Sequence, residues 1–215
     1  MIVQATEMAM AVRVAIDMNR RDASLLDEGD AETLSLDDII MAKLADAVRM
    51  VETEAPAFML EGGHDFADCN GDNVFMNDDG SGFVVLPDDF MRLVSFRMSD
   101  WKRTVFEAIG EGDPRYALQS SKWRGIRGNP EKPVCAIVRR SEGKVLEFYS
   151  CNDMGATVEQ ACYIPVPKID IDGGIDVAAD CYRAAVYRAA SLTLASLGDQ
   201  LATTMLEISK GLLTT

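Results

Sequence analysis

Strand-like runs fill the middle of this chain, and they limit the folds it can adopt more than any other feature. These segments are rich in β-branched and aromatic residues and are separated by turn residues, as strands are. They are Phe83–Leu86, Met91–Met98, Arg103–Ile109, Val134–Arg140, Val145–Cys151 and Thr157–Ile164. Between two of them, Ser141–Lys144 has the composition of a tight turn, in which Gly143 can take a positive φ. We therefore expect an antiparallel β region built around a hairpin.

The N-terminal residues have helical spacing instead. A first helix is expected from Ile2 to about Arg20, because its apolar residues recur at intervals of three and four. The main face holds Ile2, Ala5, Ala9, Val12 and Ile16, and Val3, Met10, Val14 and Met18 widen it. A face this wide predicts a helix buried over much of its circumference. A second helix is expected to begin at Ser35, capped by a box with Asp38, and to stop before Pro56.

A third helical pattern closes the chain. Apolar residues advance by three or four from about Val177 to Leu213, which predicts one long C-terminal helix. Alanines keep its first half slim enough for other helices to approach closely. Gly198 is the expected bend or break.

The order of elements is thus helix, helix, several strands and helix, without βαβ alternation. We therefore expect an α+β fold, in which a helical bundle of two N-terminal helices and one long C-terminal helix carries an inserted antiparallel β region. The expected segments are residues 1–60 for the N-terminal helices, 61–170 for the β-rich insertion and 171–215 for the closing helix. At 215 residues, a single domain with an insertion is the expectation.

Charge is unevenly distributed along the chain. The net charge is −14, which argues against a basic surface that wraps nucleic acid. Between Arg97 and Lys144, however, eleven Lys and Arg residues stand against six Asp and Glu, whereas the remainder has ten against twenty-nine. This asymmetry indicates that the basic segment could meet an acidic surface on another copy or on a partner; a solvated basic loop is the alternative.

The sequence also predicts the compartment. Its N-terminus does not resemble a signal peptide, and no apolar run has the ~20 residues of a membrane helix. The five cysteines (Cys69, Cys135, Cys151, Cys162 and Cys181) form no CxxC pair and are expected to be reduced. We therefore expect a protein of the cytosol, or of a particle assembled there, without membrane contact.

Residues for catalysis are few. No GxGxxG, GxxxxGK[ST], GxSxG or HExxH motif occurs. His64 is the single histidine and lies near Cys69 in a polar loop, while acidic runs lie at Asp68–Asp79 and at Asp170–Asp176. A small enzyme or a metal- or ligand-binding module could use these loops, but turn-rich solvated loops account for them more simply. We expect no cofactor and no catalytic or metal site.

Aromatic and basic residues cluster in the basic segment, as they do at interfaces and on single-stranded nucleic-acid platforms. The chain's acidity favours contact with protein. The candidate interface residues for an oligomer or a partner are Arg97, Trp101, Lys102, Arg103, Lys122, Trp123, Arg124 and Arg127. A structural role for Trp101, closing the sheet against a helix, is the alternative for that residue.

The segment LPDDFMRLVSFRMSDWKRTV (Leu86–Val105) resembles the β insertion of the head-to-tail adaptor proteins of tailed bacteriophages, also called connector or head-completion proteins. The later stretches Ser121–Val138, Leu146–Cys151 and Tyr163–Pro167 are similar to its continuation. The resemblance implies a non-enzymatic virion protein, made in the bacterial host cytoplasm. Its copies would form a ring, typically of twelve, that joins the portal protein to other tail or ring proteins and lets DNA pass without specific binding. A bacterial scaffold or regulatory protein unrelated to phages remains the other non-enzymatic alternative.

Overall fold

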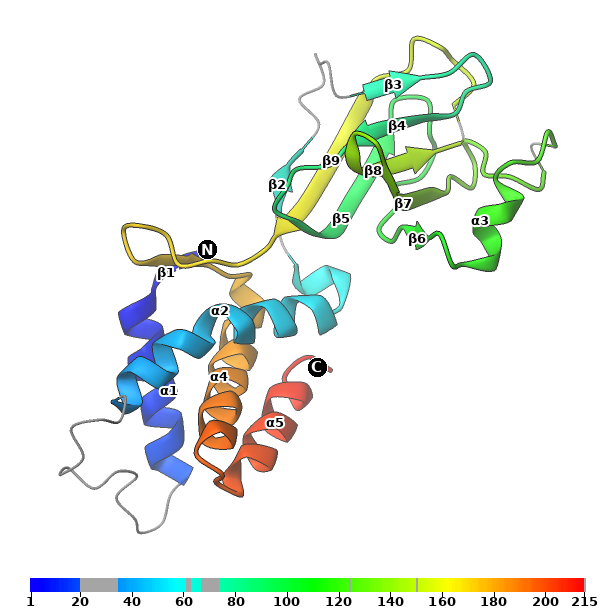
Figure 1. Ribbon diagram of the computed structural model, residues 1–215. Helices are drawn as coiled ribbons and strands as arrows, with labels where there is room; N and C mark the ends of the chain where they lie inside the picture. Colours follow the sequence, from blue (N-terminus) through cyan, green and yellow to red (C-terminus); the bar gives the residue numbers. More distant parts are fainter. Residues whose placement is uncertain (20–34, 61–62, 67–73, 124, 150, 215) are drawn as a thin grey trace. The chain divides into compact units, whose positions relative to one another are not determined.

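The computed structural model describes residues 1–19, 35–60, 63–66, 74–123, 125–149 and 151–214. The chain forms two compact units (Figure 1). The helical unit comprises Met1–Glu61 and Val166–Thr215, and the strand unit comprises Gly62–Pro165. The strand unit is thus one continuous stretch, whereas both ends of the sequence build the helical unit.

Four α-helices surround the core of the helical unit within the described residues, and a short strand pair lies beside them. The elements are β1 (Ile2–Gln4), α1 (Ala5–Asn19), α2 (Leu36–Glu54), the 3-10 turn η1 (Ala57–Met59), β10 (Gly174–Asp176), the 3-10 turn η2 (Ala179–Cys181), α4 (Tyr182–Ser196) and α5 (Leu201–Gly211). β1 and β10 pair in antiparallel register. None of the described helices is long and apolar enough to cross a membrane.

Helix α4 is central in this unit and packs against α1, α2 and α5. Its alanines Ala184, Ala185, Ala189 and Ala190 are fully buried, which lets the neighbouring helices come close. On the helices that contact α4, the apolar residues Ile16, Ile40, Leu44, Val48 and Met205 are also fully buried. The small residues of α4 therefore set how closely this bundle packs.

The predicted signals at the ends of α2 are confirmed. The Ser35 hydroxyl accepts a hydrogen bond from the Asp38 amide at 3.2 Å, and the Asp38 carboxylate accepts one from the Ser35 amide at 3.3 Å. This reciprocal capping box satisfies amide groups that the first turn leaves free. The helix ends at Glu54, because the residue before Pro56 avoids helical dihedral angles.

Two expectations for the other helices are wrong. Helix α1 begins at Ala5 rather than Ile2, and Met10 and Val14 are exposed, because α1 contacts α2 and α4 through one side that includes Met8 and Val12. The single long C-terminal helix is in fact two, α4 and α5. The chain breaks at Gly198, the expected position, whose φ of +70° favours glycine and ends the first helix.

The strand unit contains two sheets in its described residues. Its elements are β2 (His64–Asp65), β3 (Val74–Met76), β4 (Gly82–Val85), β5 (Phe90–Met98), β6 (Ile109–Gly110), α3 (Pro114–Leu118), β7 (Cys135–Arg140), β8 (Gly143–Phe148) and β9 (Val158–Pro165). The strand orders are β2-β9-β5 and β3-β4-β8-β7-β6. The β7–β8 hairpin is confirmed, with Gly143 at φ +119°.

A large aromatic core holds the two sheets of this unit together. Its buried side chains come from both sheets and include Phe66, Phe90, Phe96, Trp101, Phe148 and Tyr163. The ring centroids of Phe96 and Trp101 lie 5.6 Å apart, edge to face. A second, smaller cluster covers the other face of β7 and β8, where Ile109, Val138 and Val145 are buried. Residues on opposite faces of one sheet thus serve different cores.

The expected fold class, a helical bundle with an inserted antiparallel β region, is wrong. The described residues form a mixed α/β structure with five α-helices and ten strands in three sheets. The strand unit supplies the largest fully buried aromatic side chains, one strand pair belongs to the helical unit, and β6 pairs with β7 in parallel. Five of the six expected runs correspond to β4, β5, β7, β8 and β9, whereas Arg103–Ile109 is not one strand, since only Ile109 lies in a strand, β6. The sequence pattern could not show how much apolar surface the tertiary pairing of these strands buries.

Candidate partner-binding surface

Helix α3 starts a loop that extends from one edge of the strand unit (Figure 1). Asp113 caps this helix, since its carboxylate accepts a hydrogen bond from the Arg115 amide at 2.8 Å, and Pro114 occupies the first turn. The Arg115 guanidinium also contacts Asp113, and together with the amide it holds the pKa of that carboxyl below its usual value. The start of the loop is therefore set by local sequence.

A buried carboxylate ties α3 to the five-stranded sheet. Glu147 of β8 accepts hydrogen bonds from the Tyr116 hydroxyl at 3.2 Å, from Arg140 Nε at 2.8 Å and from the Tyr149 hydroxyl. Burial, followed by the hydrogen bond to Glu147, raises the pKa of Tyr149. Because three donors share one carboxylate, the charge of Glu147 is compensated and Tyr116 is fixed to the sheet.

Two side chains close the loop after α3 at its base. Gln119 is buried; its Nε2 donates to the Arg115 carbonyl, and its Oε1 accepts from the Gly128 amide, both at 2.9 Å. Arg127 donates to the Asp79 carbonyl at 2.8 Å and forms an ion pair with the Asp79 carboxylate at 3.3 Å. The hydroxyl and amide of Ser81, followed by Arg127, hold the pKa of Asp79 below its usual value. Hydrogen bonds and one ion pair thus hold this loop at its base, and we call it the braced loop.

This braced loop exposes large apolar side chains. Trp123 is 75% exposed, and Leu118 and Ile126 are about half exposed. The Ile126 amide donates to the Trp123 carbonyl at 2.9 Å, which fixes the turn between these two residues. We call Leu118, Lys122, Trp123 and Ile126 the Trp123 surface. An exposed tryptophan on a loop whose backbone is already held by hydrogen bonds is typical of an anchor in a protein interface, because little backbone entropy is lost on docking.

The structure brings only some of the candidate interface residues together. Lys122 and Trp123 lie on the Trp123 surface, Arg127 lies at its base, and Arg124 lies outside the described residues. The ammonium of Lys102 pairs with Glu131, and its amide donates to the Pro130 carbonyl at 2.9 Å.

The remaining candidates lie on or next to β5. Arg97 on β5 forms an ion pair with Glu159 at 3.0 Å, and Arg103 is exposed beside that strand. Trp101 is 1% exposed and packs in the aromatic core between Phe96 and Phe148. Replacing Trp101 would therefore test folding rather than docking.

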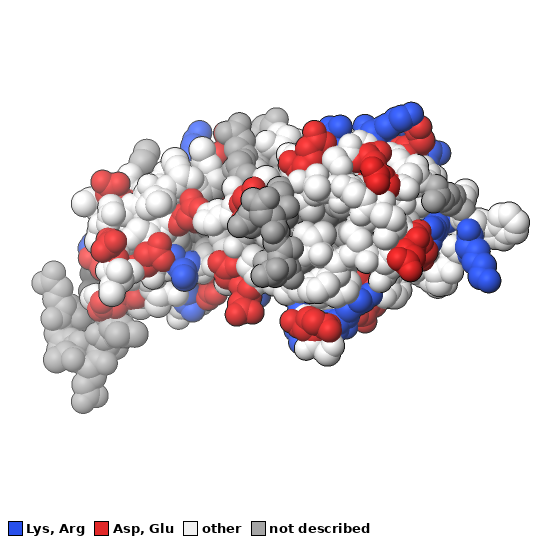
Figure 2. Space-filling model, turned by 90° about the horizontal axis from the view of Figure 1, so that it is seen from above, with Lys and Arg blue, Asp and Glu red and all other residues white. Residues whose placement is uncertain are grey.

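Much of the basic segment is already paired. Its ion pairs are Arg97–Glu159, Lys102–Glu131, Arg115–Asp113, Arg127–Asp79 and Arg140–Glu147. On the face drawn in Figure 2, basic side chains stand beside acidic ones rather than in one continuous patch. The cations of the segment without an ion pair to a described residue are Arg103, Lys122, Lys132, Arg139 and Lys144. Among these, Lys122 directly precedes the exposed Trp123 in sequence.

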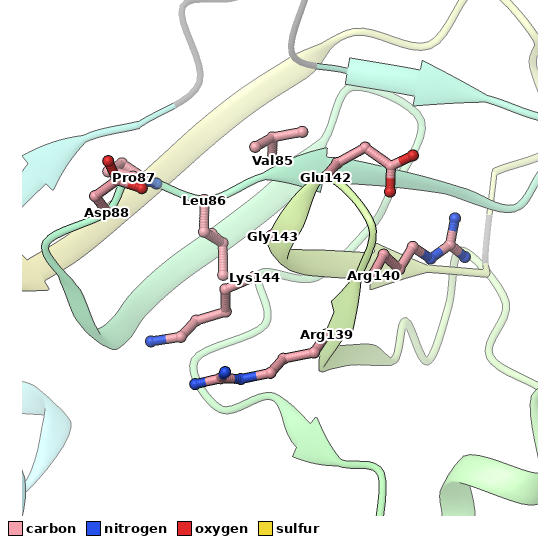
Figure 3. Close-up of a pocket in the computed structure, with 9 residues that line it drawn as sticks. All are labelled: Val85, Leu86, Pro87, Asp88, Arg139, Arg140, Glu142, Gly143 and Lys144. Carbon is pink, nitrogen blue, oxygen red and sulfur yellow. The ribbon is translucent and has the colours of Figure 1, made fainter.

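A pocket of about 360 Å³ lies at the tip of the β7–β8 hairpin. Its lining is Val85, Leu86, Pro87, Asp88, Arg139, Arg140, Glu142, Gly143 and Lys144 (Figure 3). Arg139 and Lys144 are cross-strand partners and point to the same side, and Lys144 donates to the Phe90 carbonyl at 3.0 Å. The lining residues offer charge for polar contacts, but neither a thiol, a hydroxyl nor an imidazole group for nucleophilic chemistry.

The loops considered for catalysis or metal binding are described only in part. His64 is exposed on β2 and contacts the Tyr163 ring edge to face at 5.9 Å, while Cys69 and the first half of the acidic run Asp68–Asp79 lie outside the described residues. Within the described residues, no group of three or more His, Cys, Asp or Glu side chains could hold a metal ion.

Sequence patterns missed part of this surface. Leu118, Gln119 and Ile126 were not predicted, since isolated apolar or amide residues in a Gly- and Ser-containing stretch carry no periodic signal. An apolar residue with no helical or strand partner, close to an exposed tryptophan, is the signal that could have identified Leu118 and Ile126.

No protein-family model matches this chain, and no curated protein matches it.

Proposed function

We propose that this chain is a structural protein of a tailed bacteriophage particle, whose copies form a ring at the junction between head and tail. The partners are further copies of the chain, the portal protein and other tail or ring proteins. DNA passes through the channel of the ring without specific binding. The function is mechanical and needs no catalytic group.

The Trp123 surface is the observation that carries this proposal. Three large apolar side chains and Lys122 are presented to solvent on a loop that buried Gln119 and half-buried Arg127 hold in place. Large apolar side chains exposed in this way lower the solubility of a protein unless a partner covers them. This favours a protein that works in an assembly. The resemblance of Leu86–Val105 to adaptor proteins indicates which assembly this is, a ring at the junction between head and tail.

The charge of the chain agrees with a DNA channel. A net charge of −14 gives few phosphate contacts, so DNA would not be retained by counterion release. Protein contacts, by contrast, can use the unpaired cations of the strand unit. The acidity thus favours passage of DNA over binding.

Mass photometry of the purified chain tests the proposal. We expect defined oligomers whose population rises with protein concentration, and co-purification with the portal protein encoded in the same genome. The double substitution Trp123→Ala and Ile126→Ala should weaken self-association at least about tenfold, because it removes the apolar anchors of the interface.

A matched control separates docking from folding. Phe106→Ala removes another exposed aromatic side chain of the strand unit and should leave assembly unchanged. Both variants should unfold in urea within about 0.5 kcal/mol of the wild-type chain, since exposed side chains contribute little to stability. A chain that stays monomeric at every concentration, with or without the portal protein, would contradict the proposed function.

A further inference from the structure

Helix α1 carries an exposed face that no other described element of the helical unit covers. Glu7, Met10, Val14 and Asp17 follow one another at intervals of three, four and three residues, so they share one side of the helix. All of them are exposed, Met10 at 67% and Val14 at 55%. We call these residues the α1 face. A methionine and a valine between two carboxylates form an acidic apolar surface.

The charges of this face are available to a partner. Neither Glu7 nor Asp17 forms an ion pair with a described residue. The neighbouring cation Arg13 is engaged elsewhere, because its guanidinium donates to both carboxylate oxygens of Asp37, at 2.8 and 3.0 Å. The α1 face therefore presents negative charge beside apolar side chains.

The Trp123 surface has the opposite charge and matching chemistry. Lys122 forms no ion pair with a described residue and lies next to Trp123, which is flanked by further exposed apolar residues. A tryptophan anchor commonly packs against flexible methionine and branched side chains, with charged groups at the rim. Complementary charge at that rim favours the correct partner and speeds association.

We propose that the Trp123 surface of one copy docks on the α1 face of the next copy, with Lys122 placed against Glu7 and Asp17. This inference rests on the proposed function and identifies the self-contact that the ring would use. The two surfaces differ, so the contact is head-to-tail. Contacts of this kind close into rings or continue into filaments, whereas a self-complementary contact stops at a dimer.

Charge reversal tests the pairing. Lys122→Glu gives a copy in which both surfaces are acidic, and Glu7→Lys with Asp17→Lys gives a copy in which both are basic. Each variant alone should assemble at least about tenfold more weakly than the wild-type chain, because like charges then face each other at every contact. The two lysines in α1 interact with the helix dipole in opposite ways. A lysine at position 7, in the first turn, is unfavourable, and a lysine at position 17, near the last turn, is favourable, so their effects on helix stability oppose each other.

Mixing the two variants gives the decisive result. In an assembly in which the two variants alternate, each acidic Trp123 surface meets a basic α1 face, and each basic Trp123 surface meets an acidic α1 face. Every contact therefore regains complementary charge. We expect an equimolar mixture to recover oligomers that contain both variants, measured by native mass spectrometry. A contact within one chain could not be rescued in this way.

Two charge reversals outside the proposed contact serve as controls. Lys132→Glu on the strand unit reverses one exposed charge, as Lys122→Glu does, and Asp46→Lys on α2 reverses one exposed carboxylate, where the α1 variant reverses two; both controls should leave assembly unchanged. Wild-type oligomers that both surface reversals leave intact, or that mixing fails to restore, would overturn this inference alone. If the reversals change only the urea midpoint and not assembly, the chain's own residues cover the α1 face, and this result too would overturn this inference alone. A strictly monomeric wild-type chain would overturn the proposed function as well.

Discussion

Glu52 of α2 is an acidic side chain in the interior of the helical unit. It is 2% exposed, and its carboxylate accepts a hydrogen bond from the Ala178 amide at 2.8 Å, ahead of η2. Burial raises the pKa of Glu52 from 4.5 to about 7, an effect larger than the opposing effect of that hydrogen bond. A proton is therefore held more tightly in the folded chain than in the unfolded one.

The stability of the chain should consequently depend on pH between about 5 and 8. Because the folded-state pKa is raised, the contribution of Glu52 to stability is fully present below pH 4.5 and is lost as the pH rises through about 7. Glu52→Gln keeps an acceptor for the Ala178 amide without a charge. We expect it to raise the free energy of unfolding at pH 8 by about 1–3 kcal/mol, and less at pH 5, in urea titrations.

An exposed glutamate of the same unit provides the comparison. Glu207→Gln on α5 removes the same charge from the surface and should shift the urea midpoint little at either pH. Equal responses of the two variants across this pH range would show that net charge, rather than burial of Glu52, governs the dependence.

The loop after α3 shows how one buried amide can order an element without regular structure. Gln119 bridges the Arg115 carbonyl and the Gly128 amide, so it joins the two ends of the segment that carries Trp123. Gln119→Ala would leave the Gly128 amide buried without its acceptor, which costs about 1–3 kcal/mol. We expect faster amide hydrogen exchange in residues 119–128, unchanged exchange in β7 and β8, and weaker assembly because the anchor is no longer held ready.

A second glutamine, far from the Trp123 loop in sequence, serves as the control for this change. Gln200 precedes α5, and its side chain makes no capping hydrogen bond. Gln200→Ala should therefore leave exchange in the Trp123 loop as it is. Wild-type exchange rates in residues 119–128 of the Gln119→Ala variant would refute the bracing role of Gln119.

Local signals predicted individual elements well. The box between Ser35 and Asp38, the break at Gly198 and the turn at Gly143 depend on a few neighbouring residues, and all three are present in the structure. Features that depend on tertiary contacts were missed. The strand Ile2–Gln4 forms by pairing with β10, far away in sequence, and Met10 and Val14 stay exposed because the described helices that contact α1, α2 and α4, pack against its other side.

The candidate surface was predictable to the same extent. Lys122 and Trp123 were identified from composition, because aromatic and basic residues together are unusual in an acidic chain. Composition could not distinguish exposed Trp123 from Trp101, which packs on Phe96 and Phe148. That distinction depends on which residues the two sheets bring around each indole ring.

At the scale of the whole molecule, the strand unit has the features of an independent domain. It is continuous in sequence, it has its own aromatic core, and its first and last strands are paired, with His64 opposite Tyr163. Its two ends therefore lie close together, and removing the helical unit would cut no strand pairing within either of its sheets. A stretch of this length also exceeds the ~40 residues below which small domains need disulfides or metals.

We therefore expect the excised segment Gly62–Pro165 to fold without the rest of the chain. It should give dispersed amide resonances and a single cooperative urea transition, because its core and sheets are complete within the segment. Phe96→Ala in the excised segment should lower the free energy of unfolding by about 3–5 kcal/mol, since it empties the centre of that core. If the wild-type segment shows no cooperative transition, its sheets need the helical unit in order to form, and the two units fold as one.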